Sequence, residues 1–200
     1  MKKVFTIALM LAFFPLSAFC QYFSLFGLLG IGSSVIFGGD SWNDPVGVQI
    51  GLESPVYEIS DNSMILTGLN FTWQGAGYKE TYNEPGYGGS TLSGRVRLGY
   101  LNVPVIYWFT LKDKIYGEIG LQPGVLLVAK DKYDGESYDY KDYTNKFELG
   151  LPVGAGYRLN ELFDLGVRLT YGITSIDKGA GSDHNFLAVA YLRYHLPLKK

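Results

Sequence analysis

The sequence predicts an all-β protein, an antiparallel up-and-down transmembrane β-barrel of about eight strands. Apolar residues alternate strictly with small or polar ones over two neighbouring stretches, Phe147–Arg158 and Phe163–Ile173, and this is the period of a β-strand. Aromatic residues flank the aliphatic ones on the apolar face, as in strands that cross a bilayer. Short connections alternate with long polar ones along the chain, as in the turns and loops of outer-membrane barrels.

Length and composition fit one exported domain. The chain has 200 residues, 26 of them glycine, with 18% charged residues and a net charge of −2. It is therefore neither disordered nor basic enough to indicate a nucleic-acid partner. After the first 20 residues, no stretch offers the roughly 18 uninterrupted apolar residues that a spanning helix needs.

Residues 1–20 have the pattern of a secretory signal peptide, with two lysines followed by the apolar run Val4–Leu16. We expect cleavage after Cys20, which leaves 21–200 as one barrel domain. The alternative is lipidation of Cys20, but Phe19 stands where lipoprotein signals have a small residue. Because Cys20 is the only cysteine, the mature chain has no disulfide framework and no cysteine-ligated metal site.

The first half of the barrel is expected to contain four strands. The first lies within Phe23–Phe37, which is rich in glycine and apolar on both faces, and the second is the alternating segment Pro45–Tyr57. The third runs from a tight Asp-Asn turn to about Gln74, and the fourth spans Gly94–Phe109. Glycine, proline and polar residues mark the two long loops of this half. These loops are Gly38–Asp44 and Gly75–Ser93.

The second half repeats this organisation. The fifth strand is Ile115–Lys130, and the sixth and seventh are the two alternating stretches named first. The eighth is His184–Leu196, whose aromatic and apolar end is typical of a terminal barrel strand. The long loops of this half are Asp131–Asn145 and Gly179–Asp183. An even number of strands puts both termini on the periplasmic side.

The inward face carries both acids and bases. By strand parity, these residues are Glu53, Glu118, Glu148 and Asp164 with Arg97, Arg158, Arg168 and Arg193. A barrel of about eight strands is only wide enough for side chains to fill its interior, so we expect a closed lumen. Because an unpaired buried charge is costly, we expect these residues to form a structural ion network in which Glu118, Glu53 or both neutralise Arg168.

A soluble lipocalin-like barrel that binds an apolar ligand is the alternative architecture. Its apolar face would point inward and its polar face would meet water. The polar face of this chain is instead largely glycine with scattered charges. Glycine weakens strands, so it is unexpected on a face that meets water. In the crowded lumen of a small barrel, however, glycine leaves room for the neighbouring side chains.

One segment resembles a known family of Gram-negative bacteria. Gly99–Phe109 contains Tyr-Leu-Asn-Val-Pro, a turn follows at Lys112–Lys114, and Ile115–Val125 is rich in glycine. With the later segments Gly154–Arg158 and Leu169–Thr174, these motifs resemble the PorT-type outer-membrane β-barrel family. The resemblance implies residence in the bacterial outer membrane, contact with its lipid, and a role close to protein secretion in some relatives.

Catalytic chemistry has little material in this sequence. The only histidines are His184 and His195, and neither belongs to a convincing catalytic group, so no catalytic, cofactor or metal site is expected. The acidic loop Asp131–Asn145 lacks the ligand spacing of a calcium loop. The sequence favours a non-enzymatic scaffold, surface receptor or protein-secretion accessory, with an outer-membrane enzyme as the rival class. A surface-binding loop for envelope proteins or surface ligands is expected at Tyr133, Tyr138, Tyr140 and Tyr143.

Overall fold

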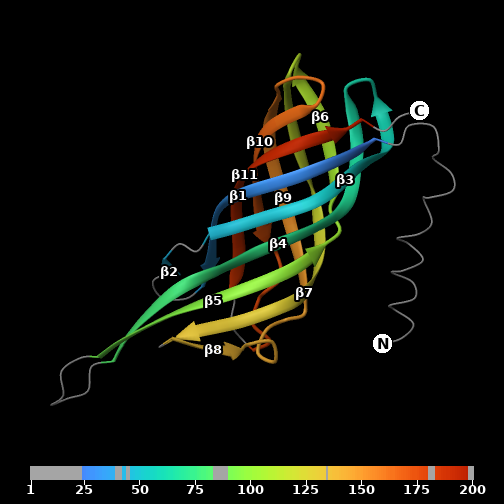
Figure 1. The fold of residues 1–200 in the computed structure, drawn as a ribbon. Coiled ribbons are helices and arrows are strands. Elements are labelled where there is room, and N and C mark those ends of the chain that lie inside the picture. The colour runs from blue at the N-terminus through green and yellow to red at the C-terminus, as the bar shows by residue number, and fades with distance from the viewer. Residues whose placement is uncertain are drawn as a thin grey trace, which may run out of the picture.

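A computed structural model of the chain describes residues 24–38, 42–43, 46–82, 90–133, 135–179 and 183–197 (Figure 1). The expected signal peptide and the fate of Cys20 lie outside these residues. Among the described residues, no helix is both long enough and apolar enough to cross a membrane.

The described chain forms one antiparallel sheet of eleven strands. They are β1 (Leu25–Phe37), β2 (Trp42–Asn43), β3 (Val46–Ser60), β4 (Ser63–Tyr82), β5 (Ser90–Asn102), β6 (Val105–Lys112), β7 (Ile115–Tyr133), β8 (Glu136–Asp139), β9 (Phe147–Arg158), β10 (Phe163–Gly172) and β11 (His184–Leu196).

The sheet closes on itself into a barrel, because β1 pairs with β11 along its whole length, from Leu25 opposite Leu196 to Phe37 opposite His184. Around the ring, β3 and β4 follow β1, and β7, β9, β10 and β11 complete the circle. Strands β5 and β6 lie end to end between β4 and β7, where they fill one position. The prediction of about eight antiparallel strands around a barrel is confirmed.

The expected fourth strand is divided in two between Asn102 and Val105. Pro104 has no backbone N–H to donate to a ladder, so strand hydrogen bonding is interrupted there. The Val103 amide still donates to the Pro123 carbonyl at 2.9 Å, and the Thr67 hydroxyl donates to the Pro104 carbonyl at 2.8 Å. The proline therefore breaks the strand but not the wall of the barrel.

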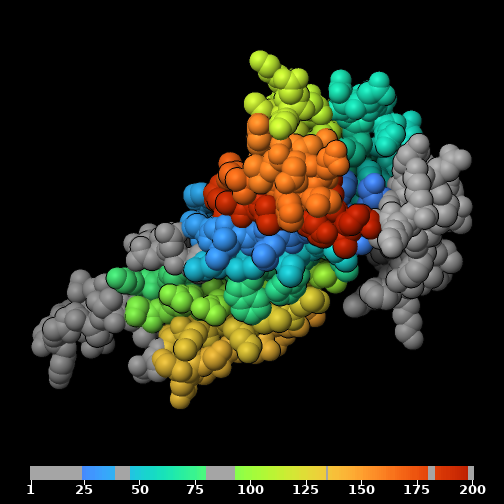
Figure 2. Space-filling model, turned by 45° about the horizontal axis from the view of Figure 1, so that its top comes forward, coloured from blue at the N-terminus to red at the C-terminus, as the bar shows by residue number. Residues whose placement is uncertain are grey.

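Three of the expected long loops are partly strand, the first because β2 lies within Gly38–Asp44 and pairs with β4. Strands β4 and β5 stay paired out to Tyr82 and Ser90, far beyond Trp73, the last β4 residue that pairs with β3. Strand β7 continues to Tyr133 and pairs with β8. The loop predictions for these parts were wrong because glycine and polar residues hide the alternation, while the two hairpins supply their own ladder of hydrogen bonds. The resulting sheet extension of β4, β5, β7 and β8 projects beyond the barrel (Figures 1 and 2).

The apolar face of the strands points away from the lumen. Aliphatic side chains of β1, β3, β4, β6, β7, β9, β10 and β11 are exposed on the outside, among them Ile31 at 64%, Leu69 at 51%, Ile119 at 45% and Val167 at 51%. An exposed apolar surface around the whole ring is what a lipid-facing barrel needs. The lipocalin-like alternative required these side chains to point inward, and the structure places them outside.

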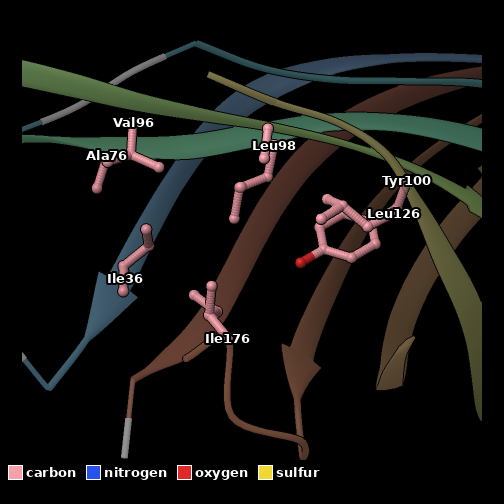
Figure 3. Packing of buried hydrophobic residues seen from close by; sticks show 8 residues of the cluster. Ile36, Ala76, Val96, Leu98, Tyr100, Leu126 and Ile176 are labelled. Carbon is pink, nitrogen blue, oxygen red and sulfur yellow. The ribbon is translucent and has the colours of Figure 1, made fainter. Parts of the chain in front are cut away.

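The lumen is filled in layers. Near the short turns, an apolar layer contains Phe26, Leu66, Ile106, Trp108 and Tyr116. Near the long loops, a second apolar layer contains Ile36, Ala76, Val96, Leu98, Tyr100, Leu126, Ala129 and Ile176 (Figure 3). Along β4 the inward residues pass from Leu66 through Asn70, Thr72 and Gln74 to Ala76. Polar and charged side chains therefore lie between the two apolar layers.

Candidate functional site

The centre of the lumen is an ion network around Arg168. This side chain is fully buried on β10, and its Nε donates to Glu118 Oε1 on β7 at 2.6 Å. Its Nη1 donates to Glu53 Oε1 on β3 at 2.8 Å. Gly154 lies opposite Arg168 on β9 and has no side chain to block the approach of Glu118, so three strands supply one compact cluster.

Arg193 on β11 completes the charge balance. Its Nη2 lies 3.0 Å from both Glu53 Oε2 and Glu118 Oε2. The Tyr191 ring stands within 5.3 Å of the guanidinium carbons of Arg168 and Arg193, and its hydroxyl lies 3.0 Å from the Tyr116 hydroxyl. Two carboxylates thus face two guanidinium groups, an arrangement that can offset the cost of burying the charges.

Asp164 forms a second, more open cluster near the short turns. Its Oδ2 lies 2.9 Å from His195 Nε2, and Arg158 Nε is 3.5 Å from its Oδ1. The Arg158 side chain is 40% exposed, whereas Asp164 is fully buried. His195 had not been assigned to this cluster from the sequence, although its position in β11 has the same parity as Arg193.

Two of the eight expected network residues lie elsewhere. Glu148 is buried, but it accepts hydrogen bonds from Gln74 Nε2 at 3.0 and 3.1 Å and from Asn185 Nδ2 at 2.6 Å, and no ion pair of the described residues joins it to an arginine. Arg97 is exposed on the outer wall. In β5 the even positions from Val96 to Asn102 point inward, because the irregularity beside Gly99 is absorbed by an extra residue on β7. The sequence analysis had shifted the parity within β5 instead.

Amide side chains that the sequence analysis did not select complete the polar interior. Asn70 Nδ2 donates to Glu53 Oε1 at 3.0 Å, and Asn102 Nδ2 donates to Thr72 Oγ1 at 3.0 Å. Both occupy inward positions of strands with clear alternation, so strand parity alone could have identified them.

A basic groove lies on the outer wall of the sheet extension, with a volume of about 780 Å³. In the strand register, Arg97 is opposite Gly75 on β4 and Lys130 on β7, and Arg95 is opposite Gly77 and Lys132. Opposed residues share a face, so these positions form one grid. The five cations that line the groove are Lys79, Arg95, Arg97, Lys130 and Lys132.

The four expected surface tyrosines form two separate pairs. Tyr133 and Tyr138 stack with centroids 4.8 Å apart, and Tyr140 and Tyr143 stack at 5.7 Å. Tyr140 also packs against the apolar layer of the lumen near the long loops. Its burial, together with nearby carboxylates, raises the pKa of its hydroxyl. Tyr143 is 68% exposed. These tyrosines therefore do not present one continuous surface.

No catalytic or metal centre is recognisable in the part of the chain that the structure describes. His184 Nδ1 bonds the Gly172 carbonyl at 2.9 Å, and His195 contacts Asp164. Within the described ranges, no group of three or more histidine, cysteine or acidic side chains could hold a metal ion.

Comparison with known proteins decides the family. The family model for the outer membrane protein beta-barrel domain matches residues 37–178. The chain belongs to this family. No curated protein sequence matches this outer-membrane barrel.

Two solved structures share the fold of this barrel. Neisserial surface protein A has 13% identity and a TM-score of 0.56, covering 87% of this chain and 97% of its own. Ail of Yersinia pestis, solved in complex with the heparin analogue sucrose octasulfate, has 15% identity and a TM-score of 0.50, covering 88% and 100%. At these identities the likeness concerns the fold alone. Together with the family, it places the barrel in the bacterial outer membrane, with its exposed aliphatic side chains in lipid.

Proposed function

We propose that this outer-membrane barrel is a non-enzymatic, non-conducting surface receptor whose sheet extension stands outside the cell. The observation that carries the proposal is the filled lumen: two apolar layers close it, and the ion network occupies the space between them. A small barrel packed in this way offers no aqueous path. Its interactions must then involve its ends or its outer wall.

Orientation follows from the lengths of the connections. The start of β1 at Leu25 and the end of β11 at Leu196 lie at the end of the barrel where the β3–β4, β6–β7 and β9–β10 turns are short. Outer-membrane barrels have short periplasmic turns and longer extracellular loops. The sheet extension, at the opposite end, is therefore assigned to the cell surface. Export through a signal peptide cleaved after Cys20 and kinship with PorT-type barrels are parts of the same proposal.

Orientation is tested by cysteine labelling in intact cells. Asp142→Cys at the long-loop end should react with a membrane-impermeant maleimide, whereas Lys114→Cys in the β6–β7 turn should react only after lysis. Both positions are exposed, and the wild-type chain serves as the background for Cys20. The reverse labelling pattern would show that the barrel has the opposite orientation, with its short turns outside the cell.

The closed lumen is tested in planar bilayers. The purified protein should give no stepwise single-channel current, and ohmic channels would contradict the proposal.

The receptor role is tested by deleting residues 132–141 and by cross-linking with mass spectrometry in the native envelope. Surface partners captured by the wild-type protein should be lost in the deletion variant. If partners persist only at the periplasmic rim, a secretion accessory replaces the receptor. A hydrolase or acyl-transfer activity abolished by acidic-loop substitutions would establish the enzyme class.

A further inference from the structure

We propose that the basic groove binds phosphate groups of glycolipids in the outer leaflet of the membrane around the barrel. This inference deepens the proposed function and rests on its orientation, with the sheet extension outside the cell. The ligand is a component of the bacterium's own membrane and not a molecule captured from solution.

The position of the groove relative to the lipid-facing surface supports this ligand. On β7, the exposed Val125 and Leu127 point outward, and Lys130 and Lys132 follow on the same wall. On β4, Leu69 and Phe71 precede the groove and Trp73 lines its edge, with the Phe71 and Trp73 rings 6.1 Å apart. Aromatic side chains mark the membrane–water interface of such barrels. The cations therefore begin at the height of the lipid headgroups.

Among the described residues, no acid lines the groove, although Asp139 on β8 is opposite Lys130 in the strand register. Among the ion pairs of the described residues, none involves Lys79, Arg95, Arg97, Lys130 or Lys132. Arg97 is directly opposite Lys130, and Arg95 is directly opposite Lys132. Like charges directly opposite each other across two strands destabilise a sheet. A bound anion would remove this repulsion.

The shape of the groove suits a phosphate group. On β4 the residue opposite Arg95 is Gly77, which lines the groove and has no side chain to fill it. Arginine presents a planar fork that binds phosphate oxygens through two hydrogen bonds, and lysine adds a compact charge. Ser93 and Ser137 line the same groove and offer hydroxyl donors. Trp73, also in the lining, offers an apolar face for a sugar ring or the start of an acyl chain.

A soluble sulfated or phosphorylated polysaccharide is the other occupant that this chemistry would accept. A membrane glycolipid is favoured because the groove begins on the side wall, where Trp73, Arg97 and Lys130 follow residues that face lipid, and continues from there to the β7–β8 turn. Headgroups of the surrounding leaflet are present there at high local concentration, so even a weak site would be filled.

The test compares lipid A preparations that differ only in phosphate. Detergent-solubilised wild-type protein is mixed with diphosphoryl lipid A or with lipid A stripped of phosphate, and complexes are counted by native mass spectrometry. We expect the diphosphoryl form to bind at least about tenfold more tightly. Each hydrogen bond between a guanidinium or ammonium group and a phosphate oxygen can change the binding constant by about tenfold. Equal binding of the two forms would overturn the inference.

Substitutions then locate the site. Arg97→Gln/Lys130→Gln should weaken diphosphoryl lipid A binding by about tenfold. The matched control Lys112→Gln/Lys114→Gln removes two exposed cations at the opposite end and should change binding less than about twofold. Single substitutions at Arg97 and Lys130 provide the same test if the double variant does not fold. An equal loss of diphosphoryl lipid A binding in the control would mean that the lipid is attracted by the net charge of the protein. That result would overturn the assignment of the binding site to the groove.

Sucrose octasulfate in place of lipid A distinguishes the sources. Tight binding of this soluble polyanion at Arg97 and Lys130, with no binding of lipid A, would replace the membrane ligand by one captured from solution. If the wild-type protein binds no lipid A, although the barrel is non-conducting and the Asp142→Cys variant labels from outside the cell, this inference is overturned and the proposed function stands. Reversed labelling would instead overturn the orientation itself.

Discussion

Arg168 Nε and Glu118 Oε1 lie 2.6 Å apart in the centre of the lumen, on strands β10 and β7, and neither side chain is accessible to solvent. Glu53 and Arg193 complete the cluster, with two acids and two bases in mutual contact. Each of these four side chains therefore contacts both cluster members of opposite charge, and Arg193 also lies 3.9 Å from Asp164 Oδ2. Removing one charge leaves an excess, and removing one of each sign leaves a matched pair.

The first prediction uses this balance. Arg168→Met should lower the free energy of unfolding by about 3–5 kcal/mol, because two buried carboxylates then share only Arg193. Adding Glu118→Gln should restore part of this loss, since Glu53 and Arg193 remain as a pair. Urea unfolding in lipid vesicles measures both changes. Arg158→Met is the control and should cost less than about 1 kcal/mol, because that side chain is 40% exposed. Losses that simply add would argue against the coupling.

The second prediction concerns Glu148, the buried acid without an arginine. Its oxygens are held by the amides of Gln74 and Asn185. Glu148→Gln keeps a carbonyl acceptor and removes a charge that no cation balances, so stability should change by less than about 1 kcal/mol. Glu118→Gln, which unbalances the ion network, should cost several kcal/mol in the same unfolding assay. Similar losses at the two positions would show that Glu148 has an ionic partner.

The third prediction concerns glycine at a close approach. A Cβ at Gly154 would lie 2.7 Å from Glu118 Oε1 and 2.8 Å from the Val167 carbonyl oxygen. Because a backbone atom must move, Gly154→Ala should cost about 1–3 kcal/mol. A Cβ at Gly27 would meet no atom within 4 Å, so Gly27→Ala should change stability by less than about 0.5 kcal/mol. Heat-induced unfolding followed by gel mobility would rank the two variants, and the reverse order would contradict the packing.

The fourth prediction concerns pH and the β10–β11 connection. Partial burial, and then the nearby Asp177, raise the pKa of the Asp183 carboxyl, while His184 opposes the shift. A raised carboxyl pKa in the folded loop favours the neutral acid, so the loop should gain stability as pH falls through that pKa. The Ile176 amide donates to the Asp183 carbonyl at 2.8 Å, and its hydrogen exchange, corrected for intrinsic rates, reports the change. In the Asp183→Asn variant, the Ile176 amide should already be protected from exchange at neutral pH, and its exchange should no longer depend on the protonation of residue 183.

Alternation in the sequence determined the architecture and most of the interior. Residues such as Leu165 and Val167 were assigned to the outer face, and Asp164 and Arg168 to the inner face, because a strand has only two faces and its side chains must alternate between them. The same rule failed at Arg97, where a shift in parity was assumed within β5 and the extra residue lies on β7. It also missed the strand extensions, where glycine removes the apolar signal.

Only the tertiary structure decided which charges meet. Arg168 contacts Glu53 across a separation of 115 residues in the sequence. The contact exists because β1 pairs with β11 and closes the ring, so that only these two strands separate β3 from β10. Glu148 and Glu118 have the same parity, but they lie at different heights in the lumen, so one meets amides and the other arginines. The basic groove likewise required the register that sets Arg97 beside Lys130. Local alternation fixes the face of each side chain, whereas its neighbours depend on strand register and ring closure, which are long-range properties of the fold.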